Sequence, residues 1–177
     1  MKKRLVWLIV AAVVLLTVTV GVTWAMLIDS SNSVVNTFTV GDVQITLTET
    51  TGSDYKLIPG MTVQKDPTVT VKEKSEECWV FVKLTPSTNL DSFCTYSIAD
   101  GWAPLEGESD VYYRKVEATL TDTSFAVLKN NQVFVKDSLT EEQLNAIVVK
   151  PTLKVTAYAI QSDGLANAKS AWQTLNS

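Results

Sequence analysis

Apolar and polar residues alternate along much of the chain. The segments 43–48 and 68–72 carry an apolar side chain at every second position. This period buries one face of a β-strand and leaves the other face in water. The segment 78–82 is apolar on both faces, which predicts a central strand. Further strands are predicted at 111–116, 133–135 and 153–160, where β-branched and aromatic residues are frequent.

Turn-forming residues separate these segments. Pairs drawn from Gly, Pro, Asn, Asp and Ser occur at 51–54, 59–60, 66–67, 100–101 and 130–131. Asn130-Asn131 lies between two apolar runs, so it predicts the turn of a hairpin. Strands at this spacing predict an all-β fold, an antiparallel β-sandwich over residues 41–177 with one or two short helices.

The two helices are predicted near the C-terminus. Ser138 to Glu141 has the form of a capping box and opens a helix at 141–147. A second helix is expected near 163–175, capped by Ser162 or Asp163. Its apolar stripe has helical spacing and would let it cover one open end of the sandwich, with Trp172 as the anchor.

The N-terminus has the pattern of an export signal. Three basic residues, Lys2, Lys3 and Arg4, precede an apolar run at 5–22 and small residues near Ala25. A basic head, an apolar middle and a small-residue exit are typical of a secretory signal peptide. We therefore predict a signal peptide at 1–25, cut between Ala25 and Met26. The alternative is a retained anchor over 5–28, which is long enough to span a membrane. Both interpretations export the rest of the chain.

Charge and cysteine content narrow the classes of partner. Without residues 1–25 the chain has 12 basic and 19 acidic residues, a net charge of −7. This balance argues against nucleic acid, because phosphate binding depends on clustered Lys and Arg. Export permits a disulfide between Cys78 and Cys94, which would contribute about 3 kcal/mol across 15 intervening residues. Two buried free thiols are the alternative.

No known catalytic motif is present. The chain contains no histidine, which removes Ser-His-Asp and Cys-His nucleophile systems and the His-Glu-x-x-His zinc site. We expect no enzyme activity and no cofactor. Glu106, Glu108 and Asp110 are weak candidates for a calcium site, since calcium prefers several oxygen ligands. The alternative for these three carboxylates is a solvated loop.

The tryptophans offer one outside candidate for carbohydrate binding. Trp79 lies in an apolar run, which predicts a core position. Trp102 has a loop-like setting after Asp100-Gly101 and is the candidate for an exposed ring that stacks on a sugar. One such ring is weak evidence for a lectin.

Several blocks, taken in order, resemble the family of TasA-like biofilm-matrix proteins and camelysins, which SipW-type signal peptidases process. The blocks are Gly21-Val22-Thr23-Trp24-Ala25, Asn36 to Gly41, Pro59-Gly60, Lys65 to Val69, Val111 to Lys115 and Ala157 to Gln161. The resemblance extends over nearly the whole chain. It implies a jelly-roll sandwich that forms, or associates with, extracellular fibres.

The resemblance also implies how such a protein assembles. The mature N-terminal segment, 26–40, would be a donor strand that inserts into a neighbouring subunit, with Phe38 and Val40 as the candidate pocket fillers. The partner would be a second copy or a related fibre subunit, with a signal peptidase acting during export. Two alternatives remain: a camelysin-like surface peptidase, against which the lack of histidine argues, and a membrane-anchored binding module.

Overall fold

The computed structural model describes residues 26–29, 37–51 and 54–177. The predicted signal peptide at 1–25, which ends at Ala25, lies outside these residues. Within them the chain is mostly β-strand with a few short helices, so the all-β prediction is confirmed. The strands are β1 (Met26–Asp29), β2 (Thr37–Val40), β3 (Ile45–Thr48), β4 (Asp54–Leu57), β5 (Thr62–Gln64), β6 (Thr68–Val71), β7 (Cys78–Pro86), β8 (Cys94–Ile98), β9 (Ala103–Pro104), β10 (Val111–Val116), β11 (Thr123–Ala126), β12 (Leu128–Val135) and β13 (Leu153–Gln161); the helices are α2 (Leu90–Phe93), α3 (Glu141–Asn145) and α4 (Ala168–Leu175).

One layer of the fold is a five-stranded sheet in the order β2-β13-β7-β10-β9. Its centre is β7, which pairs antiparallel with β13 over nine residues and with β10 over six. At the edge, β2 pairs with β13 in the parallel direction. The expectation of a purely antiparallel fold is therefore wrong at this position, because the segment that precedes the body lies along the strand near its end.

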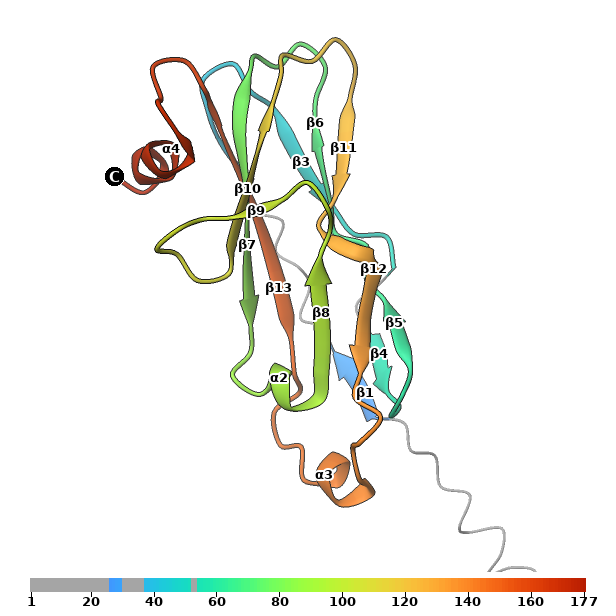
Figure 1. Cartoon of the computed structure of the whole chain (residues 1–177). Coiled ribbons are helices and arrows are strands. Elements are labelled where there is room, and N and C mark those ends of the chain that lie inside the picture. Colours follow the sequence, from blue (N-terminus) through green and yellow to red (C-terminus); the bar gives the residue numbers. More distant parts are fainter. Residues whose placement is uncertain (1–25, 30–36, 52–53) are drawn as a thin grey trace, which may run out of the picture.

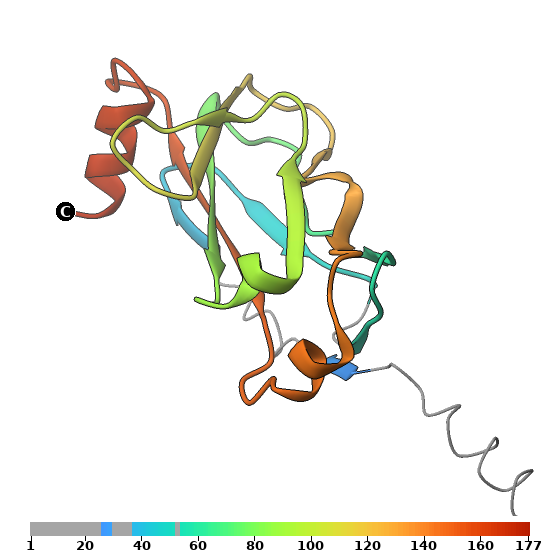
Figure 2. The same ribbon diagram turned by 60° about the horizontal axis from the view of Figure 1, so that its bottom comes forward.

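The opposite layer consists of two three-stranded sheets, β11-β6-β3 and β5-β12-β8, that follow one another along the molecule (Figure 1). Only residues 65–67 separate β5 from β6, and only Val127 separates β11 from β12. β5 and β6 are thus almost continuous in the chain, as are β11 and β12. Each of these two pairs bends where the chain passes from one sheet to the next. Figure 2 shows the space that these sheets and the five-stranded sheet enclose.

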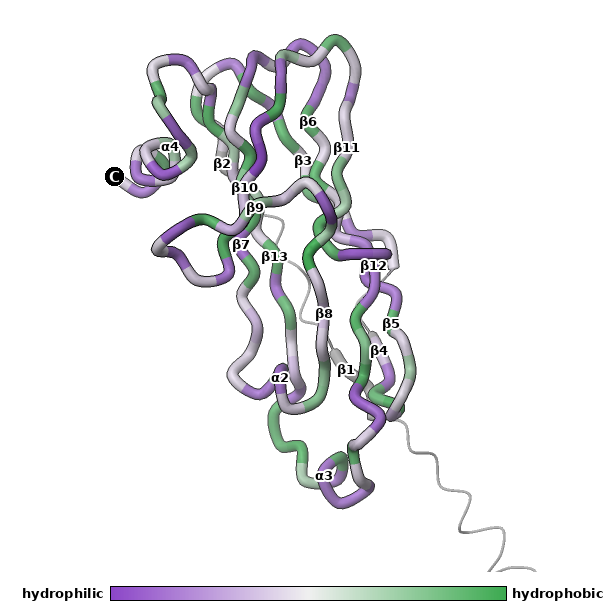
Figure 3. The backbone as a smooth tube through the Cα atoms, in the orientation of Figure 1, coloured by the Kyte–Doolittle hydropathy of each residue, from purple (hydrophilic) through white to green (hydrophobic). Residues whose placement is uncertain are grey.

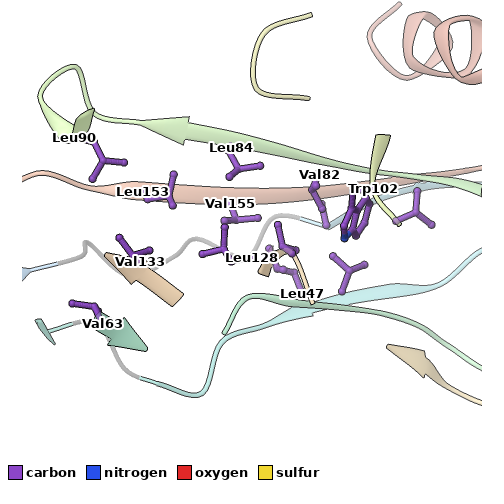
Figure 4. Packing of buried hydrophobic residues seen from close by; sticks show 14 of the residues in the cluster. Leu47, Val63, Val82, Leu84, Leu90, Trp102, Leu128, Val133, Leu153 and Val155 are labelled. Atoms are coloured by element: carbon purple, nitrogen blue, oxygen red, sulfur yellow. The ribbon is translucent and has the colours of Figure 1, made fainter. Parts of the chain in front are cut away.

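The main core fills the space between the layers. Apolar side chains at alternate positions of β7 and β13, such as Val82, Leu84 and Val155, face Leu128 and Val133 from the opposite layer (Figure 4). All five are at most 6% exposed. Figure 3 shows the hydropathy of each residue along the strands. In β3 and β6 the period-two pattern of the sequence corresponds to real burial, because alternate residues of these strands are buried.

A second, smaller core lies on the outer face of the five-stranded sheet. There α4 packs Trp172 against Phe81 and Tyr158, with ring centroids 5.2 Å apart in both pairs. The helix therefore covers a sheet face beside β7 and β10 (Figure 1), not an open end of the sandwich as expected. It begins at Ala168, later than predicted, and its cap is Asn167.

The remaining differences concern short elements. The helix predicted at 141–147 forms as α3, but Thr140 is its cap, through a capping box with Gln143, and it ends at Asn145. The four-residue helix α2 was not predicted. Asn130 and Asn131 do not form a hairpin turn: both have φ of 55° and lie inside β12, where the pairing with β8 is interrupted. The strand bulges there, because two left-handed residues add length to one side of the ladder.

Candidate assembly site

The described parts of the predicted donor segment pair with strands of their own chain. β1 forms a separate two-stranded sheet with β4, and β2 is an edge strand of the five-stranded sheet. Strand β1 pairs antiparallel with β4, placing Met26 opposite Leu57 and Asp29 opposite Asp54. Strand β2 adds to the edge of the five-stranded sheet beside β13. A strand held at an edge can be exchanged for an equivalent strand without rearranging the centre of the sheet.

The two residues predicted to fill pockets differ in what the structure describes. Phe38 lies opposite Tyr158 in the register of β2 and β13, but its side chain falls outside the described part, so its role stays a prediction. Val40, the last residue of β2, is 51% exposed and fills no pocket within its own chain. The body begins just afterwards, at Val43, which is 1% exposed.

A buried ion pair stands next to the strand that receives β1. Lys65 Nζ lies 2.7 and 2.9 Å from the two carboxylate oxygens of Glu49. The two side chains are 6% and 9% exposed. Tyr55 of β4 donates its hydroxyl to Glu49 Oε1 at 3.3 Å. Burial, followed by nearby carboxylates, raises the pKa of Tyr55, although a hydrogen bond with Thr51 lowers it.

Asp66 fixes the loop that leads into β4. Its carboxylate accepts the backbone N–H groups of Thr50 and Thr51 at 2.8 and 3.1 Å, and the hydroxyl groups of both residues. Partial burial acts to raise the pKa of Asp66, but the hydrogen bonds outweigh it and hold the pKa at about 2. The block Lys65-Asp66-Pro67 thus has a structural role: two adjacent charged residues anchor the chain before β4.

Sequence reasoning missed the burial of Lys65 because lysine is almost always exposed. The signal was nevertheless present, since Lys65 continues the alternation in which Val63 faces inward and Gln64 outward. A charged residue at an inward position predicts a buried partner of opposite charge. Glu49 is that partner.

The apolar space beside Lys65 is small. A cavity of about 30 Å³ lies among Tyr55, Val63, Lys65, Leu90, Cys94, Val133, Pro151, Thr152 and Leu153. A cavity of this size holds about one water molecule. It is too small to take a side chain from another subunit, so strand pairing, and not an open pocket, is what this region offers to a partner.

The predicted disulfide is not formed, and both cysteines are free and buried. Cys78 lies opposite Gln161 at one end of β13, whereas Cys94 lies in the cavity wall with Leu153 at the other end. Leu153 and Gln161 are the two ends of a nine-residue strand, which spans roughly 26 Å, whereas a disulfide needs Cα atoms within about 7 Å. Burial raises the pKa of both thiols to about 11.

The acidic candidates for calcium do not form a metal site. Glu106, Glu108 and Asp110 are exposed in the loop between β9 and β10. Among the described residues there is no group of three or more carboxylate, thiol or imidazole side chains placed to hold a metal ion.

The prediction that Trp102 is an exposed ring for sugar stacking is wrong. Trp102 is only 8% exposed, and its Nε1–H donates to the Ala126 carbonyl at 2.8 Å. The Arg114 guanidinium lies 5.2 Å from the Trp102 ring and 3.7 Å from the Phe125 ring. Trp102 is therefore a core residue. Trp79, expected in the core, is only partly buried on the outer face, where it packs edge-on against Tyr113.

One hollow of the described part is polar and open. It measures about 770 Å³ and is lined by Asp42, Gln44, Lys72, Glu73, Lys74, Glu76, Thr121 and Asp122. Lys72 and Asp122 neutralise one another across it, at 2.8 Å. Its exposed charges are solvated and carry no arrangement of nucleophile and base.

Comparison with family models, with curated proteins and with solved structures finds no match. No helix among the described residues is long and apolar enough to cross a membrane. The apolar run at 5–22 lies outside that part of the chain. The candidate assembly site therefore consists of β4 and the edge of β13, where β1 and β2 pair.

Proposed function

We propose that this protein is an exported structural subunit that assembles into extracellular fibres by donating its N-terminal segment to a neighbouring copy or to a related fibre subunit. The observation that supports the proposal is the edge position of β1 and β2, on β4 and β13 respectively. The family resemblance of the sequence points the same way. On this proposal the two-layer fold is a jelly roll, the N-terminal signal is removed at Ala25, and no cofactor is required.

The proposed exchange reuses the pairings seen within one chain. A donor segment leaves β4 and β13 of its own body and takes the equivalent places on the next body. Because the strand pairs that separate and the strand pairs that form are of the same kind, the exchange is a low-cost route to association. Donation from one body to the next is head-to-tail, and such an arrangement generates filaments when the rotation does not close a ring.

The body should remain folded after its donor segment has left. The central strand β7 pairs with β10 on one side and with β13 on the other over long registers that involve neither β1 nor β2. The main core begins at Val43, after the donor segment. Departure of the segment uncovers one edge of β13 and the edge of β4, and exposed edges recruit other strands.

Truncation provides the test. A chain of residues 26–177 should form filaments visible by electron microscopy, whereas a chain of residues 41–177 should fold, by circular dichroism, and stay monomeric. The shorter chain still offers its free edges but has no segment to donate, so adding it in excess should terminate growing chains and give shorter filaments. Equal polymerisation of both chains would contradict the proposal.

A further inference from the structure

Arg114 is the only arginine after residue 25, because every other basic residue of that part of the chain is a lysine. It lies in β10, opposite Val80 of β7. Its neighbours at alternate positions, Tyr112 and Val116, belong to the main core. The Arg114 side chain therefore leaves the sheet on its inner face. An arginine at an inward position calls for a reason, since arginine is rarely buried without a partner of opposite charge.

Two aromatic rings hold the guanidinium group of Arg114. Its central carbon, Cζ, lies 3.7 Å from the centroid of the Phe125 ring and 5.2 Å from that of the Trp102 ring. Phe125 belongs to β11, the edge strand of its sheet, and Trp102 directly precedes β9, the edge strand of the five-stranded sheet. The guanidinium thus lies on the side of the sandwich where both sheets end. Contact with rings engages its face and leaves the N–H groups at its edge for hydrogen bonds.

No acceptor of the described residues uses these N–H groups. Within that part of the chain Arg114 takes part in no hydrogen bond and no ion pair. Its Nε is buried without a partner, but the side chain as a whole is half-buried, so the terminal nitrogens stay accessible from the surface. Burial lowers the pKa of Arg114, and no nearby charge adds to this shift. The guanidinium is therefore a positive charge without a counter-ion.

Gly101 makes room for this guanidinium. Its φ is +87°, and a Cβ atom at this position would lie 2.8 Å from Arg114 Nη2. A side chain at position 101 would therefore displace the guanidinium from its place beside the two rings. The turn before Trp102 and the arginine of β10 are thus fitted to one another.

We propose that Arg114 anchors a binding site for a carboxylate. A carboxylate matches the planar guanidinium and accepts two parallel N–H bonds from it. The site has one positive charge, which suits a singly charged anion, whereas a phosphate or sulfate dianion would leave negative charge unbalanced beside apolar rings. The site lies at the β9 edge of the five-stranded sheet, opposite the edge that β2 occupies, so it does not depend on the strands proposed for assembly.

A free carboxylic acid and an acidic side chain of another protein offer the same chemical group. Two probes distinguish these sources: potassium acetate, and the peptide Gly-Glu-Gly with both ends capped, which carries one carboxylate. Equal affinity for the two probes would assign the site to a free acid, because the carboxylate alone is then recognised. Tighter binding of the peptide would assign it to an acidic side chain of a protein.

NMR of the arginine side chains tests the proposal. Arg4 and Arg114 are the two arginines of the chain, so Arg114→Lys assigns the Arg114 Nε–H signal by its disappearance. Potassium acetate replaces potassium chloride at constant ionic strength, which keeps the screening of charges constant. The Arg114 signal should shift with acetate until it saturates, and acetamide, which has no charge, should leave it unchanged. The indole N–H signal of Trp102 reports binding in variants that lack Arg114.

Four variants show whether the arginine itself binds. Arg114→Lys keeps the charge without the planar guanidinium and should weaken acetate binding about tenfold or more, and Arg114→Gln should abolish it. Lys83→Gln is the matched control, because it removes the same charge from an exposed position of β7, and it should leave the affinity unchanged. Gly101→Ala should weaken binding.

Gly107→Ala is the control for the glycine variant, since Gly107 has a φ of +86° but a Cβ atom there would meet nothing within 4 Å. It should bind acetate as the unaltered chain does. Circular dichroism checks that every variant is folded.

Three results would overturn the proposal. If the Arg114 signal does not shift to saturation, the ring contacts of Arg114 only stabilise the fold. A saturating shift that persists in Arg114→Gln would place the carboxylate elsewhere. Tighter binding of sulfate or phosphate than of acetate would contradict a site for a singly charged carboxylate. Filament formation is not a readout of this experiment, so its failure leaves the assembly proposal standing.

Discussion

Gly41 joins β2 to the body, and its replacement tests how closely β2 is fitted against β13. Its φ is +87°, in the left-handed region that favours glycine. A Cβ atom at this position would lie 2.7 Å from Gln161 Oε1 and 3.0 Å from Gln161 Cβ. Since Gln161 is the last residue of β13, the obstacle is the strand with which β2 pairs.

Gly107 supplies a matched control. Its φ is +86°, but a Cβ atom there would meet nothing within 4 Å. Alanine at such a φ costs about 1–2 kcal/mol, and the lower entropy of the unfolded chain offsets about 0.4–1 kcal/mol of this. Gly107→Ala should therefore lower the free energy of unfolding by about 1 kcal/mol. Gly41→Ala adds overpacking of about 1–3 kcal/mol, for a total of about 2–4 kcal/mol.

Urea denaturation of the monomeric chain measures both variants. Adding Gln161→Ala to Gly41→Ala removes Oε1 and leaves Cβ, so it should restore part of the lost stability. Hydrogen exchange along β13 should quicken in Gly41→Ala and stay unchanged in Gly107→Ala. Equal destabilisation by the two glycine variants would refute the close fit of β2.

Three further predictions concern the body. Trp172→Ala should lower the free energy of unfolding by about 3–5 kcal/mol, while the exposed neighbour variant Gln173→Ala should change it by less than about 0.5 kcal/mol; equal urea midpoints would contradict the second core. Asp66 has a folded pKa of about 2, below its ordinary value of 3.8. Its stabilisation should therefore be complete above pH 3.8 and disappear as the pH falls through 2, and Asp66→Asn should remove that part of the pH dependence of unfolding; an unchanged pH profile would refute the role of Asp66. Cys78 and Cys94 should react slowly with iodoacetamide in the folded chain and quickly in urea without reductant, because both are buried thiols; resistance to alkylation in urea would indicate a disulfide.

The long central strands could be predicted from the sequence because both of their faces are buried. The apolar run at 78–82 lies in β7 and the run at 153–160 in β13. Such segments can be recognised as strands without knowing which segments pack against them. The order of strands and the parallel pairing of β2 with β13 could not be predicted, because they depend on which distant segment occupies an edge.

Short elements were harder to predict from the sequence because more than one residue suited the same position, such as a helix cap. Ser162 and Asp163 are good helix caps by residue type, but Ser162 donates its hydroxyl to Glu77 Oε1 at 2.5 Å. The true cap, Asn167, forms a reciprocal capping box with Ser170. Trp102 follows a glycine turn, as an exposed residue would, yet the bond from its Nε1 to the Ala126 carbonyl lets it enter the core.

The buried part of the candidate site was also outside the reach of sequence patterns. Lys65 and Glu49 are 16 residues apart in the chain. Neither residue predicts its partner by itself. Their ion pair forms only when the fold brings the amine and the carboxylate together.

Strand exchange between molecules can be tested with a pair of variants that each add one cysteine to the two buried native thiols, Cys78 and Cys94. In the register of β1 and β4, Leu27 lies opposite Lys56. Leu27→Cys and Lys56→Cys are made in separate 26–177 chains, mixed, allowed to assemble and then oxidised. Strand exchange predicts a disulfide-linked dimer that contains one chain of each kind, and this dimer should be absent when the mixture is held as monomers. Filaments that form without this mixed dimer would contradict exchange of the N-terminal strand.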